Sequence, residues 1–378
     1  MRHKLLVLGA TLTVLILVLA VAVRLRYGGG EHYPDLTTTP RFSDSSLETV
    51  VSYHQPIGNV AVSANGRVLF TVHPESRPTG AKLLEWRGGA AVPFPDESRQ
   101  DGLFETPLGV VIDRRDRLWT IDHGNHGFGS VRLLAFDLAT GEILDDHVFS
   151  KTVAPRGSFL QDLQVDPSGD TVYIADVGFW ARRPALVVYD VRSGTARRVL
   201  ERHPSVFPQD WIIRTPTKRM VFFGGLAALK PGVDGLAVDF GGEWLYYGAM
   251  THDGLYRVRT ADLTDPALPA GELAHRVQRF SDKPLNDGLS TDLEGRIYIT
   301  DVEHGAVLRV GADRRLETLI KTPRIRWADA LSFGPGGWLY VADSAIPDQV
   351  MRSKAHIDSQ APYHIYRFRP GAAGTPGQ

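Results

Sequence analysis

The sequence predicts an all-β protein, a single six-bladed β-propeller built of four-stranded antiparallel blades. Three observations predict this fold: a strand–turn–strand phrase that occurs six times, a spacing between copies that suits one blade, and a spare N-terminal strand. The copies begin at Gly58, Leu108, Gln161, Asp234, Asp287 and Asp329. They recur every 42 to 53 residues apart from one interval of 73, and a propeller blade takes about 40 to 50 residues.

Each copy of the phrase has the pattern of a β-hairpin. An apolar run leads into a short turn, and a second run rich in β-branched and aromatic residues follows. Most copies are followed by a third apolar run, such as Leu133–Phe136 or Leu255–Val258, and some by a weaker fourth, such as Arg197–Leu200. The long interval contains an insertion at Val206–Gly232. The blades are therefore expected to have four strands each.

The sixth blade runs out of sequence before its outer strand. Only Gly- and Pro-rich residues follow Phe368, and we expect residues 371–378 to form a flexible tail. Leu47–Val50 is nearly a copy of Leu316–Leu319 and can supply the missing strand. An N-terminal strand in the last blade would remove the open edge that the ring of sheets otherwise leaves. The propeller is therefore expected to occupy residues 42–370.

The N-terminus has the features of a targeting segment. A positively charged start at Met1–Lys4 precedes Leu5–Val23, which contains no charge, and Ala20–Ala22 matches a signal cleavage pattern. The apolar run also nearly reaches the roughly 20 residues that a bilayer requires. Residues 1–27 are therefore expected to be a signal peptide or an uncleaved membrane anchor, followed by a polar tether at 28–41. Both alternatives imply an exported protein, secreted or periplasmic.

Composition excludes several kinds of chemistry. The chain has no cysteine, so disulfides, thiolate nucleophiles and Cys-bound metals are ruled out. A net charge of -1 gives no reason to expect nucleic acid, or membrane contact other than through the N-terminal segment. Nucleophile elbows, phosphate loops, dinucleotide fingerprints and zinc-protease motifs are all missing from the sequence. We expect a monomer whose partner is a small-molecule ligand or substrate.

The polar residues of the repeats fall into two columns on one face of the ring. The start of the first strand and the end of the second strand lie at the same end of the central channel. Asp234, Asp287 and Asp329 begin first strands, and carboxylates close to one axis repel unless a cation or protons intervene. Aspartates that end second strands, such as Asp301, are instead expected to bond turn backbone. Blade three has one extra turn residue, so Gln161 or Asp162 can face the channel.

Neighbouring loops add further candidates. Acidic and amide oxygens suit a hard divalent cation such as Ca²⁺, whereas histidines and an aromatic ring suit a small polar or aromatic ligand. Each of these side chains can also be an ordinary loop residue. The candidate catalytic residues are Asp234 and Asp287; the candidate ligand-binding residues are Gln161, Asp162, Trp180, His123, His252 and His304; and the candidate metal ligands are Asp234, Asn286, Asp287, Asp329 and Glu105.

Four phrases occur in a familiar order. Arg117–Gly124, Phe159–Asp166, Asp234–Asp239 and Leu339–Ser344 resemble successive segments of the major royal jelly/yellow protein family. That resemblance implies a secreted six-bladed propeller that binds small aromatic amines in the channel mouth or takes part in a dopachrome-conversion-like isomerisation. The chain lacks the cysteines typical of the insect members and is more similar to a bacterial relative.

The architecture is also similar to that of the gluconolactonase and regucalcin propellers. The resemblance implies one divalent cation in the channel, held by Glu, Asn and Asp, and hydrolysis of a sugar lactone. Asp234, Asn286 and Asp287 resemble the corresponding phrases, but no early Glu matches well. Three functions follow as hypotheses: a metal-assisted lactone or ester hydrolase, a binder of aromatic or amine ligands, and a structural propeller. The fold alone does not separate them.

Overall fold

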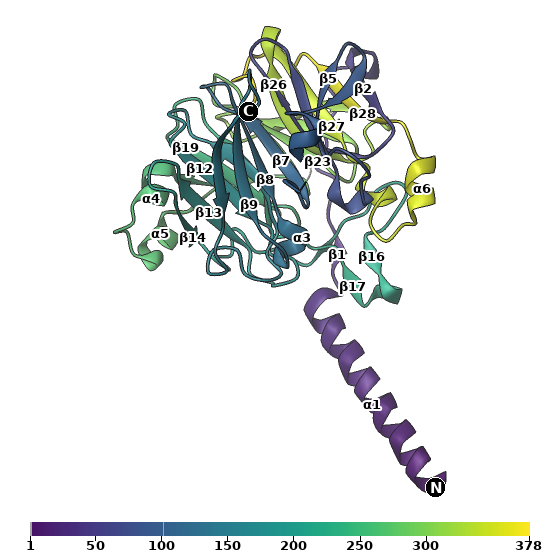
Figure 1. The fold of residues 1–378 in the computed structure, drawn as a ribbon. Coiled ribbons are helices and arrows are strands. Elements are labelled where there is room, and N and C mark those ends of the chain that lie inside the picture. The colour runs from purple at the N-terminus through teal and green to yellow at the C-terminus, as the bar shows by residue number, and fades with distance from the viewer. Residues whose placement is uncertain (1, 101) are drawn as a thin grey trace.

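The computed structural model describes residues 2–100 and 102–378 and confirms the six-bladed all-β propeller (Figure 1). Met1 and Asp101, which the sequence assigns to the N-terminal segment and to the propeller, lie outside the described residues. Blade one consists of β3 (Ile57–Val62), β4 (Val68–Val72), β5 (Leu83–Arg87) and β6 (Ala90–Pro93). Blade two consists of β7 (Pro107–Ile112), β8 (Arg117–Asp122), β9 (Arg132–Asp137) and β10 (Ile143–Val148). Blade three consists of β11 (Leu160–Val165), β12 (Thr171–Asp176), β13 (Ala185–Asp190) and β14 (Thr195–Val199).

The remaining blades repeat this order, and the last one closes the ring. Blade four consists of β18 (Val233–Val238), β19 (Trp244–Ala249), β20 (Gly254–Arg259) and β21 (Gln278–Asp282). Blade five consists of β22 (Leu289–Thr291), β23 (Ile297–Asp301), β24 (Ala306–Val310) and β25 (Leu316–Lys321). Blade six consists of β26 (Ala328–Gly334), β27 (Trp338–Asp343), β28 (Tyr363–Phe368) and β2 (Glu48–Tyr53). The N-terminal β2 pairs antiparallel with the C-terminal β28, so the predicted closure is confirmed.

The core lies between adjacent blades. Residues of the inner strands are buried on both faces, which is why these strands read as nearly continuous apolar runs; β3 and β7 are buried along their whole length. One cluster joins Ile121 of blade two to Leu163 of blade three, and another joins Phe70 of blade one to Ile365 of blade six. Each blade therefore completes its core only with its neighbours.

Elements outside the blades gather at one face of the ring or at its rim. A long helix, α1 (Arg2–Tyr27), projects from this face (Figure 1). The predicted insertion before blade four contains short strands and forms an arm: β15 (Trp211–Ile212), β16 (Val221–Phe222) and β17 (Ala227–Ala228). The strand β1 (Glu31–His32) pairs with β15. The short helices are α2 (Glu97–Gln100), α3 (Gly124–Gly127), α4 (Thr260–Thr264), α5 (Ala270–Arg276) and α6 (Lys354–Ser359).

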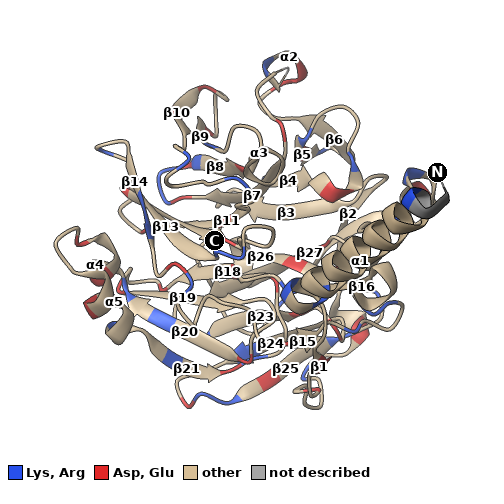
Figure 2. Ribbon diagram, turned by 90° about the horizontal axis from the view of Figure 1, so that it is seen from below, with Lys and Arg blue, Asp and Glu red and all other residues tan. Residues whose placement is uncertain are grey.

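The last residues of the chain differ from the flexible tail expected for 371–378. Gly377 donates its N–H to Phe333 O at 2.9 Å and accepts from Ile112 N at 3.0 Å, and Gln378 O accepts from Phe333 N at 2.9 Å. Gly374 forms a bridge with Asp292. Figure 2, which views the ring from the side of α1, shows the C-terminus at its centre. The tail is ordered because it satisfies backbone groups that the first strands leave open at the far end of the channel.

Candidate ligand-binding site at the channel mouth

A cavity of about 390 Å³ opens at the end of the channel nearest to α1. Three aspartates line it, one from each of three successive blades: Asp234 from β18, Asp287 from the residues that lead into β22, and Asp329 from β26. Their exposed fractions are 1%, 6% and 6%. The start column of the repeats therefore does converge on one cavity.

Bulges at this end of the first strands explain how blade three contributes two side chains. The pairing of β11 with β12 shifts register between Leu160 and Asp162, and a bulge lets neighbouring residues face the same side. Gln161 lines the mouth and donates its amide N–H to Asp234. Asp162 lies deeper in the channel, where it accepts from the backbone N–H groups of Leu163 at 2.9 Å and Leu236 at 3.3 Å. Both alternatives left open by the sequence thus face the channel.

The axial acids favour their protonated forms. Burial raises the pKa of Asp287 to about 8 and that of Asp162 to about 7. Burial, followed by the charge of Asp287, holds the pKa of Asp234 and of Asp329 well above the usual range. One oxygen of Asp234, Oδ2, is buried without a hydrogen-bond partner in the described structure. The mouth therefore retains protons at neutral pH unless a cation replaces them.

Two neutral side chains that sequence reasoning missed contact these acids. Trp327 donates its indole N–H to Asp287 at 2.7 Å. His73 Nε2 lies 3.7 Å from Asp329, and its Nδ1 accepts from the Glu75 N–H at 3.2 Å. Burial lowers the pKa of His73 to about 4, so its ring is neutral. Both had a signal in the sequence: Trp327 stands two residues before Asp329, and His73 follows a second strand just as His123 does.

An apolar wall surrounds the acids. Phe159, Phe179 and Trp180 come from the ends of blade three, and Trp180 is 50% exposed at the rim. The centroids of Phe179 and Trp180 lie 5.0 Å apart in an edge-to-face arrangement. The rest of the apolar lining comprises Val23, Tyr27, Leu108, Val177, Phe222, Phe223, Ala227, Leu229, Pro231, Met250, Trp327, Ile346, Val350 and Met351. None of the described lining residues is Lys or Arg.

Blades one and two add an acid–histidine pair to the edge of the mouth. His126 Nε2 lies 2.9 Å from Glu75 Oε1, and both side chains line the cavity. His123, a predicted ligand-binding residue, lies behind this pair. Its Nδ1 accepts from the His126 N–H at 3.0 Å, and the centroids of the His123 and Phe159 rings lie 4.3 Å apart. His123 lines an adjacent hollow rather than the mouth, so it supports the wall instead of forming it.

Several predicted site residues lie elsewhere. Asn286 is buried, and its amide donates to the Asp287 carbonyl at 2.8 Å while its oxygen faces Gly248. Glu105 is exposed beside Gly129. His252 accepts the Gly254 N–H at 2.9 Å. None of these three lines the mouth as described: Asn286 and His252 bond neighbouring backbone groups, and Glu105 is exposed to solvent.

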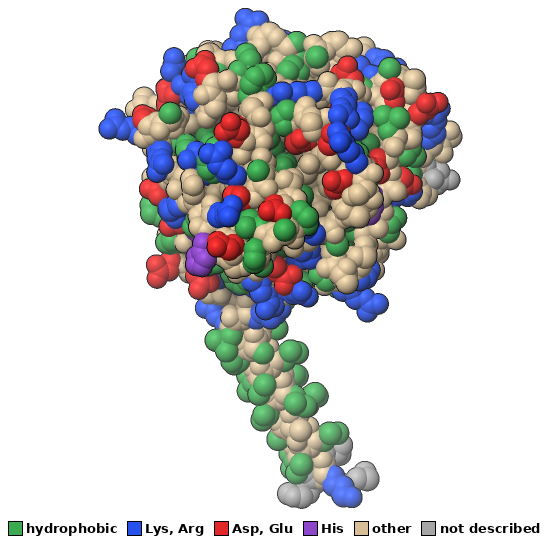
Figure 3. Space-filling view, turned by 90° about the vertical axis from the view of Figure 1, so that its left-hand side faces the viewer, with side chains coloured by type: hydrophobic (Ala, Val, Ile, Leu, Met, Phe, Trp, Pro, Cys, Tyr) green, Lys and Arg blue, Asp and Glu red, His purple; other side chains and the backbone are tan. Residues whose placement is uncertain are grey.

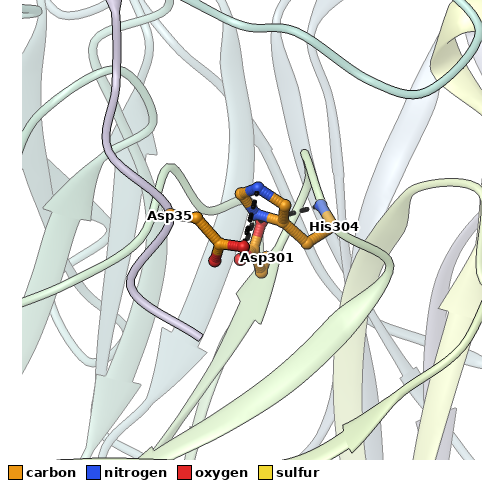
Figure 4. A group of neighbouring side chains, drawn as sticks. All are labelled: Asp35, Asp301 and His304. Atoms are coloured by element: carbon orange, nitrogen blue, oxygen red, sulfur yellow. Dashed lines mark hydrogen bonds and ion pairs between the residues drawn. The ribbon is translucent and has the colours of Figure 1, made fainter. Parts of the chain in front are cut away.

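His304 belongs to a separate cluster (Figure 4). Its Nδ1 lies 2.9 Å from Asp301 and its Nε2 3.6 Å from Asp35. The hydrogen bond to Asp301 raises the pKa of His304, and Lys321 lies 3.2 Å from Asp35. Among the described residues this is the one group in which three His or carboxylate ligand atoms lie within 4.8 Å of one another. Lys321 and His304 pair with its acids, and these contacts attach the segment after α1 to blade five.

The aspartates that end second strands have structural roles. Asp122 accepts from the backbone of Thr106 at 2.9 Å, Asp176 from Phe159 at 2.6 Å and Asp343 from Trp327 at 2.8 Å. Each carboxylate thereby ties the loop before a first strand to the end of the second strand in the same blade, as expected from the sequence. This bonding positions Phe159 and Trp327 at the mouth.

The fold and this site define a six-bladed propeller with an acidic, aromatic-walled pocket at one channel mouth. A model of the major royal jelly protein family matches residues 106–318, more than half of the chain. The chain belongs to the major royal jelly protein family.

The individual curated relatives share less than 30% identity with the chain. Major royal jelly protein 6 of Apis mellifera is 29% identical over 215 residues, which cover 51% of this chain and 46% of that protein. The chain spans less than half the length of the curated relatives that it matches.

Solved structures share the fold. A gluconolactonase from Xanthomonas campestris has a TM-score of 0.55 at 15% identity, covering 91% of this chain and 97% of that one. Regucalcin from Agrobacterium tumefaciens strain C58, described as a calcium-binding protein, has a TM-score of 0.53 at 14% identity, covering 90% and 97%. The predicted family and the wider structural similarity are both confirmed.

Proposed function

We propose that the channel mouth binds a small organic amine that carries an aromatic or other apolar body. The observation that carries this proposal is a set of buried carboxylates in an apolar cavity whose described lining includes no Lys or Arg. An ammonium group between Asp234, Asp287 and Asp329 would take the place of the protons that burial otherwise retains. The apolar body would lie against Phe159 and Trp180, where aromatic faces also favour a cation.

Binding of this kind depends on pH. The acids must lose protons before they attract the ammonium group, and the pKa values of Asp162 and Asp287 are raised to about 7 and about 8. A primary amine stays protonated throughout this range, since its pKa resembles that of lysine, about 10. Affinity is therefore expected to rise as pH increases from 6 to 8.5, and binding should release protons to the buffer.

Calorimetric titration of the full-length protein in detergent with tryptamine tests the proposal. The matched neutral ligand is tryptophol, which replaces the amine with a hydroxyl and should bind much more weakly. Asp234→Asn should weaken tryptamine binding at least tenfold, about 1.4 kcal/mol. Asp313→Asn, at an exposed turn between β24 and β25, serves as the control. Equal affinity for the two ligands, or an unaltered affinity in Asp234→Asn, would contradict an amine site.

A metal-assisted lactone or ester hydrolase is the second candidate. Oxygen ligands on the channel axis favour it, and they are the donors that Ca²⁺ prefers. The donor set fits poorly as it stands. Asn286 directs its oxygen towards Gly248, and the axial carboxylates do not form a described group with three ligand atoms within 4.8 Å. Titration with CaCl₂ under the same conditions separates the candidates: tight Ca²⁺ binding that Asp287→Asn abolishes, with no response to tryptamine, would favour the hydrolase.

We also propose that the propeller is exported and acts outside the cytoplasm as a monomer. Its N-terminal helix supports export, since Leu6–Tyr27 is long and apolar enough to cross a membrane. The sequence contains no cysteine, so folding in an oxidising compartment does not depend on disulfides. Fractionation of cells that express the full chain, with protease added to spheroplasts, tests the location: digestion of the propeller without lysis is expected, and full protection would contradict it.

A further inference from the structure

Helix α1 leaves the propeller at the face that holds the channel mouth (Figures 1 and 3). Its last turn is joined to this face: Tyr27 donates its hydroxyl to Trp180 O at 3.0 Å, Arg26 donates to Ala181 O at 3.3 Å, and Arg24 donates to Gly225 O. Tyr27 and Val23 themselves line the mouth. The end of the apolar helix is therefore a part of the site and not a separate appendage.

The glycines after α1 hold it in this position. A Cβ on Gly28 would lie 2.7 Å from Leu226 O, and one on Gly30 would lie 2.7 Å from Asp210 O. Lys230, which is 3% exposed, donates to Gly28 O at 2.9 Å and to Asp210 at 2.8 Å. Through these close contacts the insertion before blade four packs against the end of the helix and fixes its position. The glycines therefore do not form a loose linker.

The length of α1 fixes how far the mouth can lie from a bilayer. Leu5–Val23 provides 19 uncharged residues, which at 1.5 Å per residue span about 28 Å. The hydrocarbon core of a bilayer is about 30 Å thick. A helix that spans this core has no residues to spare, so Arg24 must lie at the bilayer surface. Gly225 and the rim of the mouth, which contact Arg24, must then lie there too.

The composition of the rim suits this location. Trp180, Phe223 and Met351 line the mouth yet are 50%, 65% and 64% exposed. Large apolar side chains on a surface mark a contact site, and aromatic residues concentrate where membrane and water meet. Figure 3 shows Lys and Arg side chains around the point where α1 emerges; Arg214 and Arg219 on the arm are exposed. Such cations attract anionic lipid headgroups.

We propose that α1 is retained as a membrane anchor and holds the propeller with its channel mouth against the bilayer, so that Trp180, Phe223 and Met351 lie among the lipid headgroups. This surface goes beyond the contact through the N-terminal segment alone that the sequence led us to expect. The proposal depends on the contacts between the end of α1 and the propeller and on the exposed apolar side chains of the rim. It does not depend on which ligand the mouth binds.

Retention of the helix is tested on the full-length protein expressed in a bacterial host. Intact mass and the N-terminal peptide of the membrane-extracted protein should include residues 1–27, and alkaline carbonate should not release the protein from membranes. A mature chain that begins just after Ala22 would overturn the proposal, because the helix would then be removed.

The orientation is tested with single cysteine labels, which are specific because the chain has no cysteine. Phe223→Cys and, independently, Met351→Cys are labelled with a polarity-sensitive fluorophore, and the protein is reconstituted into vesicles of neutral and anionic phospholipids that contain a headgroup-labelled quencher lipid. Leu293→Cys, 47% exposed at the far end of the ring, is the matched control. Both mouth labels should lose most of their fluorescence and the control very little. Equal quenching at all three positions, or none at the mouth, would overturn the proposal.

Discussion

After burial, Asp287 has the largest influence on the pKa values of the neighbouring acids Asp234 and Asp329. Of the charged neighbours of these two acids, Asp287 raises the pKa of each the most. Its own pKa is raised from 3.8 to about 8 by burial. A folded-state pKa above the unfolded value contributes stability at low pH, and this contribution is lost as pH rises through the folded pKa. The protein without bound amine is therefore expected to lose stability as pH rises from about 4 to about 8.

Asp287→Asn should remove much of this loss, because asparagine resembles the protonated acid. We expect the variant to be more stable than the parent protein at pH 8, by on the order of 1 kcal/mol or more, and the gain to shrink towards pH 5. Thermal unfolding at several pH values in the absence of amine measures it. A stability difference that does not change with pH would show that Asp287 is ionised in the empty mouth.

Trp327 controls the same acid through one hydrogen bond. Its indole N–H lowers the pKa of Asp287, against the larger effect of burial. Hydrogen bonds to charged groups contribute about 1.5 to 3 kcal/mol, so Trp327→Phe should raise the pKa of Asp287 by roughly 1 to 2. The pH at which tryptamine binding reaches half of its maximum should move upwards accordingly. A lower affinity with an unchanged pH midpoint would mean that the indole acts only through packing.

At this scale the repeats predicted the axial acids but not all of their neighbours. Asp234, Asp287 and Asp329 were found because a fixed position in each repeat maps to a fixed place around the ring. Asn286 failed to accompany Asp287 because successive side chains of an extended backbone point to opposite sides. His73 occupies the same repeat position as His123, but its contact with Asp329 joins the first blade to the last, and the local sequence pattern does not show that contact.

At the scale of elements, the C-terminal tail acts as a plug for the far end of the channel. It completes backbone hydrogen bonds of β7 and β26 and is held beside the turn before β23. Gly374 lies so close to Phe333 that a Cβ there would be 2.1 Å from the ring. The sequence suggested a flexible tail because Gly and Pro dominate it, whereas its order comes from the close approach that glycine permits.

Truncation after Pro370 should destabilise the propeller. Several backbone groups of the inner strands would lose partners, at about 1 kcal/mol each, so the total loss should be a few kcal/mol. Chemical unfolding measures it, and tryptamine affinity in the folded state should change little because the mouth lies at the other end. An unaltered free energy of unfolding would show that water replaces the tail without cost.

At the scale of the whole molecule, the ring depends on β2, which brings the two ends of the propeller together. Val51 is fully buried between β28 and its neighbours, whereas the adjacent Ser52 is exposed on the other face of the strand. Without β2, β28 would be the unpaired edge strand of an incomplete last blade.

Val51→Asp should open the ring, because an unpaired carboxylate in an apolar core costs several kcal/mol. We expect loss of the cooperative unfolding transition and aggregation of the purified protein, as measured by circular dichroism and size-exclusion chromatography. Ser52→Asp places the same charge on the same strand and should leave both measurements nearly unchanged. Similar behaviour of the two variants would contradict a closing role for Val51.

The sequence by itself determined the number of blades, the closure, the family and the column of acids, because each follows from a repeat that sets position around a ring. Tertiary structure alone decided which side chains share the mouth, how α1 is seated against it and what closes the far end. These features come from contacts between blades that lie far apart in the chain, and from backbone groups that seek partners wherever the fold brings them close.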